Sequence, residues 1–329
     1  MEYFKEALGG DGLVFAANSE QSPALCCADE AVRTPLIYDP DYIPFLLGFC
    51  KSHAVGLLVS LIDIDLPVLS RHKQEFEAIG VKMAVSDPEV LISCNDKYQM
   101  SLKLWRSQIR CPETCISEED ALLKLSAGLL HFPLVVKPRF GMGSIGIALA
   151  YDKKELHAFY QSTRRAVQTS YLKYESAAAG DACVVIEERC EGNEYGLDVV
   201  NDFAGNYITT IVRKKLAMRA GETDEAVILG EKDKEYSILT ELGAQISKSF
   251  GHIGNMDVDV ILNPDTKAPY VIDMNARFGG GYPFSHLAGA DLPRAYVAWA
   301  KSEKVPESCF SVRAGVHGYK DMVLRAYPG

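Results

Sequence analysis

The stretch PLVVKPRFGMGSIGIALA, residues 133–150, places Gly141, Gly143 and Gly146 at the spacing G-x-G-x-x-G. That spacing marks a dinucleotide-binding turn only when a strand leads into the glycines and a helix leaves them. Residues 134–136 supply the strand, but the residues after the third glycine are apolar, partly β-branched and soon followed by a turn. They predict a second strand. We therefore expect the glycines to lie in a hairpin loop, and the dinucleotide interpretation fails.

The composition is that of an ordinary globular enzyme. The chain has 329 residues, 48% of them apolar and 24% charged, which is enough for two or three modest domains. Its formal net charge of −10 argues against a nucleic-acid partner. We expect no membrane segment and no signal peptide, and hence a cytoplasmic protein. The nine cysteines are scattered, and neither Cys26-Cys27 nor Cys111 with Cys115 has the spacing of a zinc site.

The first 90 residues alternate strands and helices. Strands are expected over residues 12–18, 54–63 and 81–86, and helices over 42–53 and 66–80. Such alternation predicts a parallel sheet in an open α/β domain. The chain nevertheless opens on a helix, residues 2–8, where such a domain normally opens on a strand. Either this is a natural variation, or a first strand and its turn are missing.

Beyond residue 95 the pattern changes. Helices are expected over 97–109, capped by Asn95 or Asp96, over 117–128, capped by Ser117, and from Asp152 onwards. The strand 183–190 follows. We then expect strands over 194–202, 207–216, 257–262 and 270–276, forming a mostly antiparallel sheet with one polar face.

Two segments carry groups suited to a nucleotide. Lys137 ends a strand beside the glycine loop, where it can reach a phosphate while loop N–H groups cover the others. Glu187 and Glu188 end the next apolar strand, whose backbone can pair with an adenine edge, and Glu194 can accept ribose hydroxyls. The alternatives are a solvated lysine and an acidic surface loop.

The strongest pattern is a pair of strands with polar residues on one face. Asp257 and Asp259 alternate with valines, and Asp273, Asn275 and Arg277 share a face of the next strand. A turn separates the strands, which predicts a hairpin with Asp259 close to Asp273. Carboxylate and amide oxygens suit Mg²⁺ bound together with phosphate. A solvated polar face is the alternative.

Four basic residues follow one another on a further strand and its loop: Arg213, Lys214, Lys215 and Arg219. In an acidic protein such a cluster is suited to an anionic phosphate or carboxylate. A plain exposed strand would have the same sequence.

In this order, these segments resemble the ATP-grasp superfamily, and most nearly one half of the carbamoyl-phosphate synthetase large subunit. The resemblance runs from about Asp96 to Asp291 and rests on NDK, VVKPRFGMGSIG, IEERCEGNE, RAGE, VDV and IDMNAR. For ATP, it implicates Lys97, Lys137, Gly143, Ser144, the backbone of Glu187, Arg189 and Cys190, and the side chain of Glu194. It implicates Arg219 beside the transferred phosphate and Asp259, Asp273 and Asn275 as metal ligands, with Arg277 next to them.

The resemblance implies a fold that is α/β and α+β. Two α+β subdomains would grip ATP, after a Rossmann-like domain that lacks its first strand. The implied domains are 1–92 and 93–329, the second with a lid subdomain at about 112–186. This chain departs from the family at Asp273, where Glu is usual, and at Ala276, where Pro is usual.

The implied activity is that of an ATP-dependent carboxylate–amine ligase. ATP and Mg²⁺, or Mn²⁺ in its place, would serve an acyl-phosphate reaction in which Arg277 holds the carboxylate. The partners would be a small carboxylate, an amine and, as is common in the superfamily, a second copy in a homodimer. Two alternatives stay open: a carbamoyl-phosphate-type ligase acting on bicarbonate, and a non-catalytic ATP-binding protein.

Overall fold

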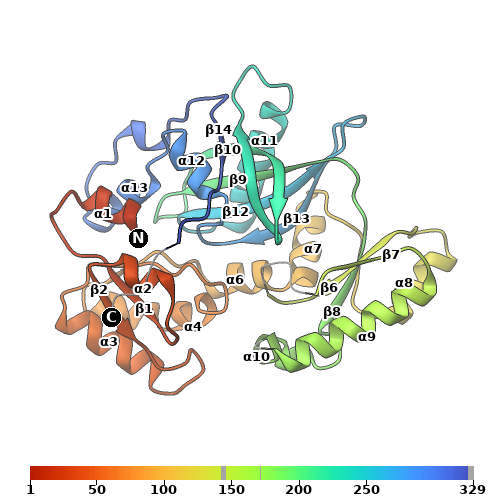
Figure 1. The fold of residues 1–329 in the computed structure, drawn as a ribbon, viewed down its shortest axis with the longest axis horizontal. Helices are drawn as coiled ribbons and strands as arrows, with labels where there is room; N and C mark the ends of the chain where they lie inside the picture. The colour runs from red at the N-terminus through yellow and green to blue at the C-terminus, as the bar shows by residue number, and fades with distance from the viewer. Residues whose placement is uncertain (142–145, 171, 325–329) are drawn as a thin grey trace.

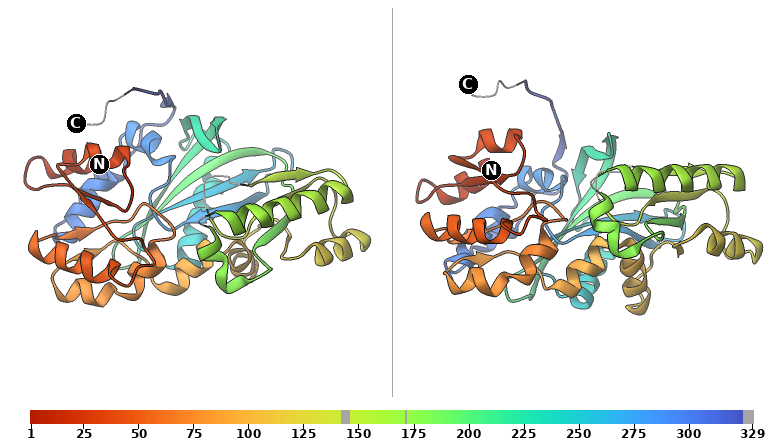
Figure 2. Two further views of the ribbon diagram at one scale, coloured as in Figure 1. Left: turned by 60° about the horizontal axis from the view of Figure 1, so that its bottom comes forward. Right: turned by 90° about the horizontal axis from the view of Figure 1, so that it is seen from below.

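The computed structural model describes residues 1–141, 146–170 and 172–324. Three parts pack against one another (Figure 1): N-terminal elements, a central sheet, and a lid that extends away from the N-terminal elements. The same elongated arrangement is visible from two further directions (Figure 2). One hydrophobic cluster joins the N-terminal helices to the central sheet, whereas the lid has a cluster of its own.

The N-terminal part alternates helices with short parallel strands. Its elements are α1 (Glu2–Leu8), β1 (Phe15–Asn18), α2 (Pro23–Cys27), β2 (Glu30–Arg33), α3 (Tyr42–Ser52), β3 (Leu57–Leu58), α4 (Leu66–Arg71), α5 (Lys73–Ala78), β4 (Lys82–Met83) and α6 (Pro88–Asn95). Strand β1 pairs with β2 and β3 with β4, both in parallel, which confirms the α/β pattern. In the described ranges these strands form two separate pairs.

The prediction of a single helix over residues 66–80 is wrong in detail, because the structure has two helices there, α4 and α5. His72, at φ −106° and ψ 9°, both ends α4 and begins α5. Its side-chain Nδ1 lies 2.6 Å from Oε1 of Glu75, so the second helix starts with a local side-chain contact. The break lets the chain turn without a proline or glycine, which is why the sequence pattern did not show it.

The lid is a four-stranded antiparallel sheet with helices beside it. Helix α7 (Lys97–Arg106) precedes the lid, and its Met100 and Leu104 belong to the cluster of the central sheet. The elements of the lid are β5 (Thr114–Cys115), α8 (Glu118–Ser126), β6 (Leu134–Pro138), β7 (Ala148–Ala150), α9 (Lys153–Thr169), α10 (Leu172–Ser176), η1 (Ala177–Ala179) and β8 (Val184–Glu188). The strand order is β5-β8-β6-β7, and β6 pairs with β7 in antiparallel fashion, which confirms the hairpin. Side chains of Asp96, Ser117 and Asp152 cap α7, α8 and α9.

The central sheet has six antiparallel strands in the order β13-β12-β9-β10-β11-β14. Its elements are β9 (Asn193–Asn201), β10 (Tyr207–Arg219), β11 (Glu222–Ile228), α11 (Tyr236–Phe250), β12 (Asn255–Leu262), β13 (Pro269–Asn275), α12 (Tyr282–Leu287), α13 (Leu292–Ala300), η2 (Glu307–Phe310) and β14 (His317–Tyr319). Helix α11, which packs on β9 and β10, was not predicted from the sequence.

The first helix packs beside the last ones. Tyr3 of α1 stacks on His286, with ring centroids 3.8 Å apart, and Phe4 meets Phe278 and Tyr296 edge to face. Helix α1 therefore lies against the C-terminal helices rather than on the N-terminal strands (Figure 1). Among the described residues, no helix is long and apolar enough to cross a membrane.

Replacing each of two helical glycines with alanine should change the stability of the protein in opposite directions. A Cβ on Gly243 of α11 would collide with the Thr210 side chain of β10, whereas a Cβ on Gly48 of α3 would meet nothing within 4 Å. We expect Gly243→Ala to lower the free energy of unfolding by about 1–3 kcal/mol, because overpacking strains a close contact. The matched Gly48→Ala should raise it by about 0.5–1 kcal/mol, since alanine is the better helix former. Urea unfolding measures both, and equal effects would contradict the packing argument.

The buried imidazole of His252 predicts a loss of stability in mild acid. Its Nε2 lies 2.9 Å from the Val199 carbonyl, and burial lowers its pKa to about 4, against that hydrogen bond. Because the unfolded chain takes up the proton near pH 6.5, stability should fall by about 3 kcal/mol as the pH drops from about 6.5 to 4. His252→Gln should flatten this slope in urea unfolding, while the exposed His131→Gln should not. An unchanged slope in His252→Gln would refute the assignment.

Candidate active site

A cavity of about 330 Å³ lies between the lid and the central sheet. Its walls come from β6 on one side and from β9, β10, β12 and β13 on the other. The cavity brings together seven residues that the family resemblance implicated: Lys97, Lys137, Glu194, Asp259, Asp273, Asn275 and Arg277. Residues more than 170 positions apart thus share one polar cleft.

The β12–β13 hairpin forms the acidic floor, and the hairpin prediction is confirmed. Asp259 lies opposite Asp273, and Asp257 lies opposite Asn275. The residues between them on β12, Val258 and Val260, are fully buried. Alternation along β12 therefore sends the valines into the core and the carboxylates toward the cavity.

A β-bulge in this hairpin leaves one backbone carbonyl free to accept a hydrogen bond from outside the sheet. The register steps from Asp259 opposite Asp273 to Val260 opposite Val271, which leaves Ile272 without a partner on β12. The Ile272 carbonyl instead accepts a hydrogen bond from Lys137 Nζ at 3.3 Å. The bulge thus ties the floor of the cavity to the lid, in keeping with the role of bulges beside active sites.

Buried lysines face the carboxylates. Lys137 Nζ lies 2.7 Å from Glu187, and Lys215 Nζ lies 2.7 Å from Asp259. Burial acts to lower the pKa of each lysine, but the carboxylates around them outweigh it and the net shift is upward. Both ammonium groups are therefore charged at neutral pH. Lys97 Nζ, 3.6 Å from Asp273, adds a third positive charge.

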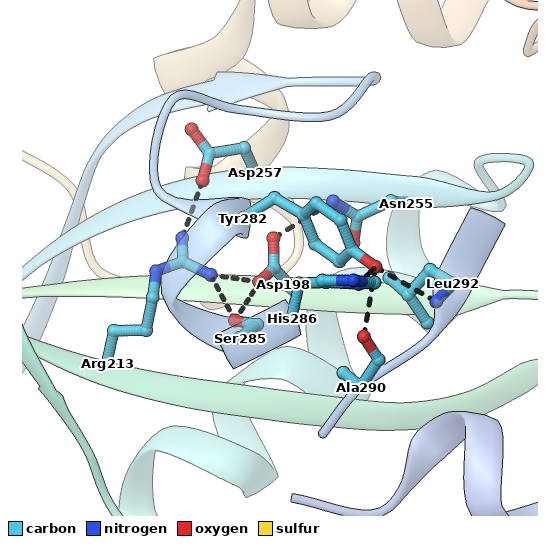
Figure 3. Close-up of polar contacts among 9 residues, drawn as sticks. All are labelled: Asp198, Arg213, Asn255, Asp257, Tyr282, Ser285, His286, Ala290 and Leu292. Carbon is cyan, nitrogen blue, oxygen red and sulfur yellow. Dashed lines mark hydrogen bonds and ion pairs between the residues drawn. The ribbon is translucent and has the colours of Figure 1, made fainter. Parts of the chain in front are cut away.

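A buried guanidinium lies under this floor (Figure 3). Arg213 of β10 donates to Asp198 of β9, to Asp257 of β12 at 2.8 Å and to Ser285 of α12 at 3.0 Å. Asn255 donates to the other Asp198 oxygen at 2.9 Å. Burial raises the pKa of Asp257 to about 7, although Arg213 acts in the opposite direction. The network fixes where the Asp257 carboxylate lies relative to the cavity.

The same view shows how the segment after α12 is held (Figure 3). The hydroxyl of Tyr282 donates to the Ala290 carbonyl at 3.1 Å and accepts from the Leu292 amide at 3.0 Å. Tyr282 thereby fixes the helix that carries Ser285.

Arg277 connects the central sheet to the N-terminal part. Its Nη2 lies 2.6 Å from Oδ2 of Asp63, and its Nη1 donates to the Phe278 carbonyl at 3.1 Å. Its Nε has no hydrogen-bond partner among the described residues. Burial opposes the charge of Arg277, but Asp63, Asp257 and Asp273 raise its pKa overall. Sequence reasoning did not find Asp63, 214 positions away.

The other residues that the resemblance implicated are not among the described residues that line the cavity. Glu187 is buried with its side chain on Lys137, Arg189 is exposed and Cys190 is partly buried. Arg219 does not line the cavity in the described structure, because its guanidinium pairs with Asp224 and donates to the Lys320 carbonyl. Gly143 and Ser144 lie outside the described residues.

Three further cavity residues belong to the polar patterns of the sequence, but the resemblance gave them no role: Arg213, Lys215 and Asp257. The signal was present in the sequence, since Arg213 and Lys215 alternate along one strand and Asp257 shares a face with Asp259. The loop motif RAGE assigned Arg219 to the phosphate. The antiparallel registers of β9 with β10 and β12 instead bring Lys215 to the acidic floor.

The donor set is compatible with a divalent cation that also binds phosphate. Asp259, Asp273 and Asn275 offer hard oxygen atoms on one cavity wall, as Mg²⁺ prefers. Within the part of the chain described, no group of three or more His, Cys, Asp or Glu side chains could hold a metal ion by itself. Two carboxylates and an amide therefore fit a metal whose other ligands come from the substrate and water.

Comparison with known proteins gives a consistent family. The model described as carbamoyl-phosphate synthase L chain, ATP binding domain, matches residues 96–308, and the one described as PylC-like, N-terminal domain, matches residues 1–84. Multifunctional protein URA2 of Saccharomyces cerevisiae is 23% identical over 284 residues, which are 80% of this chain but only 12% of that protein.

Two solved structures share the fold. The biotin carboxylase domain of Hydrogenobacter thermophilus 2-oxoglutarate carboxylase, in complex with MgADP, ADP and bicarbonate, has a TM-score of 0.73 at 18% identity and covers 95% of this chain and 70% of that one. The L-amino acid ligase from Bacillus licheniformis has a TM-score of 0.70 at 19% identity, covering 91% and 72%. At these identities the likeness concerns the fold.

Removal of the buried guanidinium should be far more costly than removal of a surface one. Arg213→Met leaves Asp198 and Asp257 without their cation, and we expect a loss of about 3–5 kcal/mol in the free energy of unfolding. The control Arg164→Met breaks an ion pair with the exposed Asp181 and should cost less than about 1 kcal/mol. Chemical denaturation compares the two, and similar losses would show that the buried network is not a structural constraint.

Proposed function

This chain belongs to the family of the carbamoyl-phosphate synthase L chain, ATP binding domain, with the ATP-grasp fold, and on that premise we propose that it is an ATP-dependent carboxylate–amine ligase. The observation that carries the proposal is the arrangement of charges in the cavity. Carboxylates of the β12–β13 floor face lysines from the lid, from α7 and from β10. A site of this kind can accept a polyanion together with a divalent cation and can stabilise charge that moves between phosphate oxygens.

We assign the nucleotide end to the lid side of the cavity. Lys97, Lys137 and Lys215 would bind phosphate oxygens, and Glu194, on the cavity wall, would accept ribose hydroxyls. The backbone of Glu187, Arg189 and Cys190 would pair with the adenine edge, and the loop with Gly143 and Ser144 would cover the phosphates. Arg219 would serve the transferred phosphate only after leaving Asp224.

Asp259, Asp273 and Asn275 would hold Mg²⁺, or Mn²⁺ in its place. Bound there, the ion would supply positive charge that offsets the negative charge of the phosphates. The protein's own contribution is positional, because the β12–β13 register and the bulge at Ile272 fix these oxygens relative to Lys137.

The reaction would run in two transfers. A carboxylate oxygen of the acid attacks the γ-phosphorus, the bond from that phosphorus to the bridging oxygen breaks, and ADP leaves with the electron pair. An amine nitrogen then attacks the acyl carbon, inorganic phosphate leaves, and the surplus amine proton passes to water. Arg277, with its free Nε, would hold the acid and stabilise the oxyanion of the second step.

The same proposal divides the chain at about residue 92. Residues 1–92 would form the domain before the grasp, and residues 93–329 the grasp itself, with a lid at about 112–186 that has its own hydrophobic cluster. The partners would be a small carboxylate and an amine, in a protein active in the cytoplasm, with a homodimer as the assembly to test.

The decisive measurement is phosphate release from Mg-ATP over a panel of carboxylates, with and without amines. We expect one class of acid to stimulate release, and Asp273→Ala to abolish the stimulation because it removes a metal ligand. Bicarbonate belongs in the panel, since the structurally similar biotin carboxylase domain was solved with it. Stimulation by bicarbonate alone would favour the carbamoyl-phosphate type of ligase. Mg-ATP binding without any stimulation would instead indicate a non-catalytic ATP-binding protein.

A further inference from the structure

A second, smaller hollow adjoins the main cavity. Its volume is about 10 Å³, and its polar lining consists of Asp63, Asn95, Lys97, Glu175, Asp273 and Asn275. Lys97, Asp273 and Asn275 line both spaces, so the hollow opens at the phosphate end of the cavity. A space of this size holds one group as large as a water molecule.

Carboxyl groups outnumber cations around this hollow. Among the described residues it is lined by three carboxyl groups, those of Asp63, Glu175 and Asp273, and by one cation, Lys97. Arg277 pairs with Asp63 from the side of the main cavity, which brings the count to three carboxyl groups against two cations. Lys97 already donates to the Gly141 carbonyl at 2.9 Å.

Two of the residues that line the hollow, Asp63 and Glu175, each have a carboxylate oxygen without a hydrogen-bond donor among the described residues. Asp63 is only 5% exposed, and Arg277 occupies its Oδ2, but its buried Oδ1 has no hydrogen-bond partner among the described residues. The buried Oε2 of Glu175 likewise has no hydrogen-bond partner among the described residues. Burial raises the pKa of Glu175 to about 7, with Asp63 adding to the shift and Lys97 opposing it, and burial raises the pKa of Asp63 as well. A bound cation would lower both pKa values again and keep the carboxylates ionised. A buried acceptor without a donor is costly, so a cationic ligand that donates hydrogen bonds would stabilise these carboxyl groups.

The position of Asp63 is fixed in advance. Asn95 donates to the Asp63 backbone carbonyl at 3.0 Å, and Ser60 donates to Asp65 at 3.0 Å across the same loop. The loop therefore presents the free carboxylate oxygen without reorganising on binding, which lowers the entropic cost of recognition.

We propose, resting on the ligase function above, that this hollow binds the ammonium group of an α-amino acid and that this amino acid is the acid activated by ATP. An ammonium group is about as large as water, donates three hydrogen bonds and carries the missing positive charge. Water would satisfy the two oxygens but would leave the negative charge uncompensated.

The bound ammonium belongs to the acid and not to the attacking amine. Nearby carboxylates favour the protonated form of an amine, and a protonated nitrogen has no lone pair with which to attack an acyl carbon. An α-carboxylate is two bonds from its ammonium nitrogen. It would therefore point from the hollow toward Asn275 and Arg277, where the γ-phosphate is expected. The product would be an amide or peptide with a free amino terminus.

Hydroxylamine trapping tests this assignment without knowledge of the natural amine. Hydroxylamine attacks the acyl phosphate, phosphate leaves and a stable hydroxamate of the activated acid is formed. With Mg-ATP and wild-type protein, we expect hydroxamates from one group of standard L-amino acids. Their desamino and N-acetyl counterparts should react with a kcat/KM lower by about tenfold or more, the effect of losing a charge-assisted contact.

Glu175→Gln is the variant to compare, since Glu175 makes no ion pair with Arg277. It should raise the KM for the amino acid by about 10- to 100-fold while leaving the KM for ATP within about twofold. Glu119→Gln, an exposed change on α8, is the control and should alter neither constant. Asp63→Asn should act like Glu175→Gln on the amino acid, and its thermal unfolding reports whether the loss of charge beside Arg277 disturbs the fold.

Each outcome discriminates. Desamino acids that form hydroxamate as readily as amino acids would overturn the ammonium site and leave the ligase intact. An unchanged KM for the amino acid in Glu175→Gln, with Asp63→Asn also unchanged, would do the same. The absence of hydroxamate and of phosphate release with every acid, despite Mg-ATP binding, would remove the ligase function and this inference with it.

Discussion

The central sheet depends on one buried guanidinium, that of Arg213, which connects several of its elements. Arg213 is 2% exposed and bonds to β9, β12 and α12 from its own strand β10. The chain leaves room for it with glycines, because a Cβ on Gly196 would lie 2.9 Å, and one on Gly281 2.7 Å, from its Nη2. Since desolvation offsets much of the attraction in a buried ion pair, we infer that the contribution of this network is chiefly geometric: it connects β10 to β9, β12 and α12 at fixed positions.

The acidic floor determines the charge balance of the cavity. The Asp259 carboxylate lies against Lys215, and that of Asp273 faces Lys97. Opposed charges at these distances attract one another and hold the side chains of the floor and of the lysines in place. Under the proposed function, the carboxylates would hold the metal and the lysines would hold the phosphate oxygens, so the site is complementary in charge to both parts of the ligand.

Local patterns predicted the parts of the site that a single strand pair can specify. Alternation in residues 257–262 and 270–276 gave the hairpin, and the apolar residues on both sides of the glycines gave the β6–β7 hairpin. Contacts between parts of the chain that are distant in sequence leave no such pattern in the sequence. The pairing of Asp63 with Arg277 depends on how the N-terminal part packs on the sheet, and the turn of Arg219 toward Asp224 depends on the β10–β11 register. Helix α11 was missed although the sequence carries its signals: Leu239, Leu242, Ile246 and Phe250 recur at helical spacing, and Gly251 ends the helix in the left-handed conformation.

The two ends of the cavity differ in which parts of the chain build them. The phosphate end is made by α7, the lid and the central sheet, through Lys97, Lys137 and the β12–β13 floor. The acid end is where all three parts meet, since Asp63 comes from the N-terminal part, Glu175 from α10 and Arg277 from the segment after β13. If the two ends bind as proposed, substitutions near Asp63 would change the acid that is recognised and leave the nucleotide contacts in place. Under that proposal, the N-terminal segment, which matches a different family description from the grasp, is the part of the chain best placed to determine substrate choice.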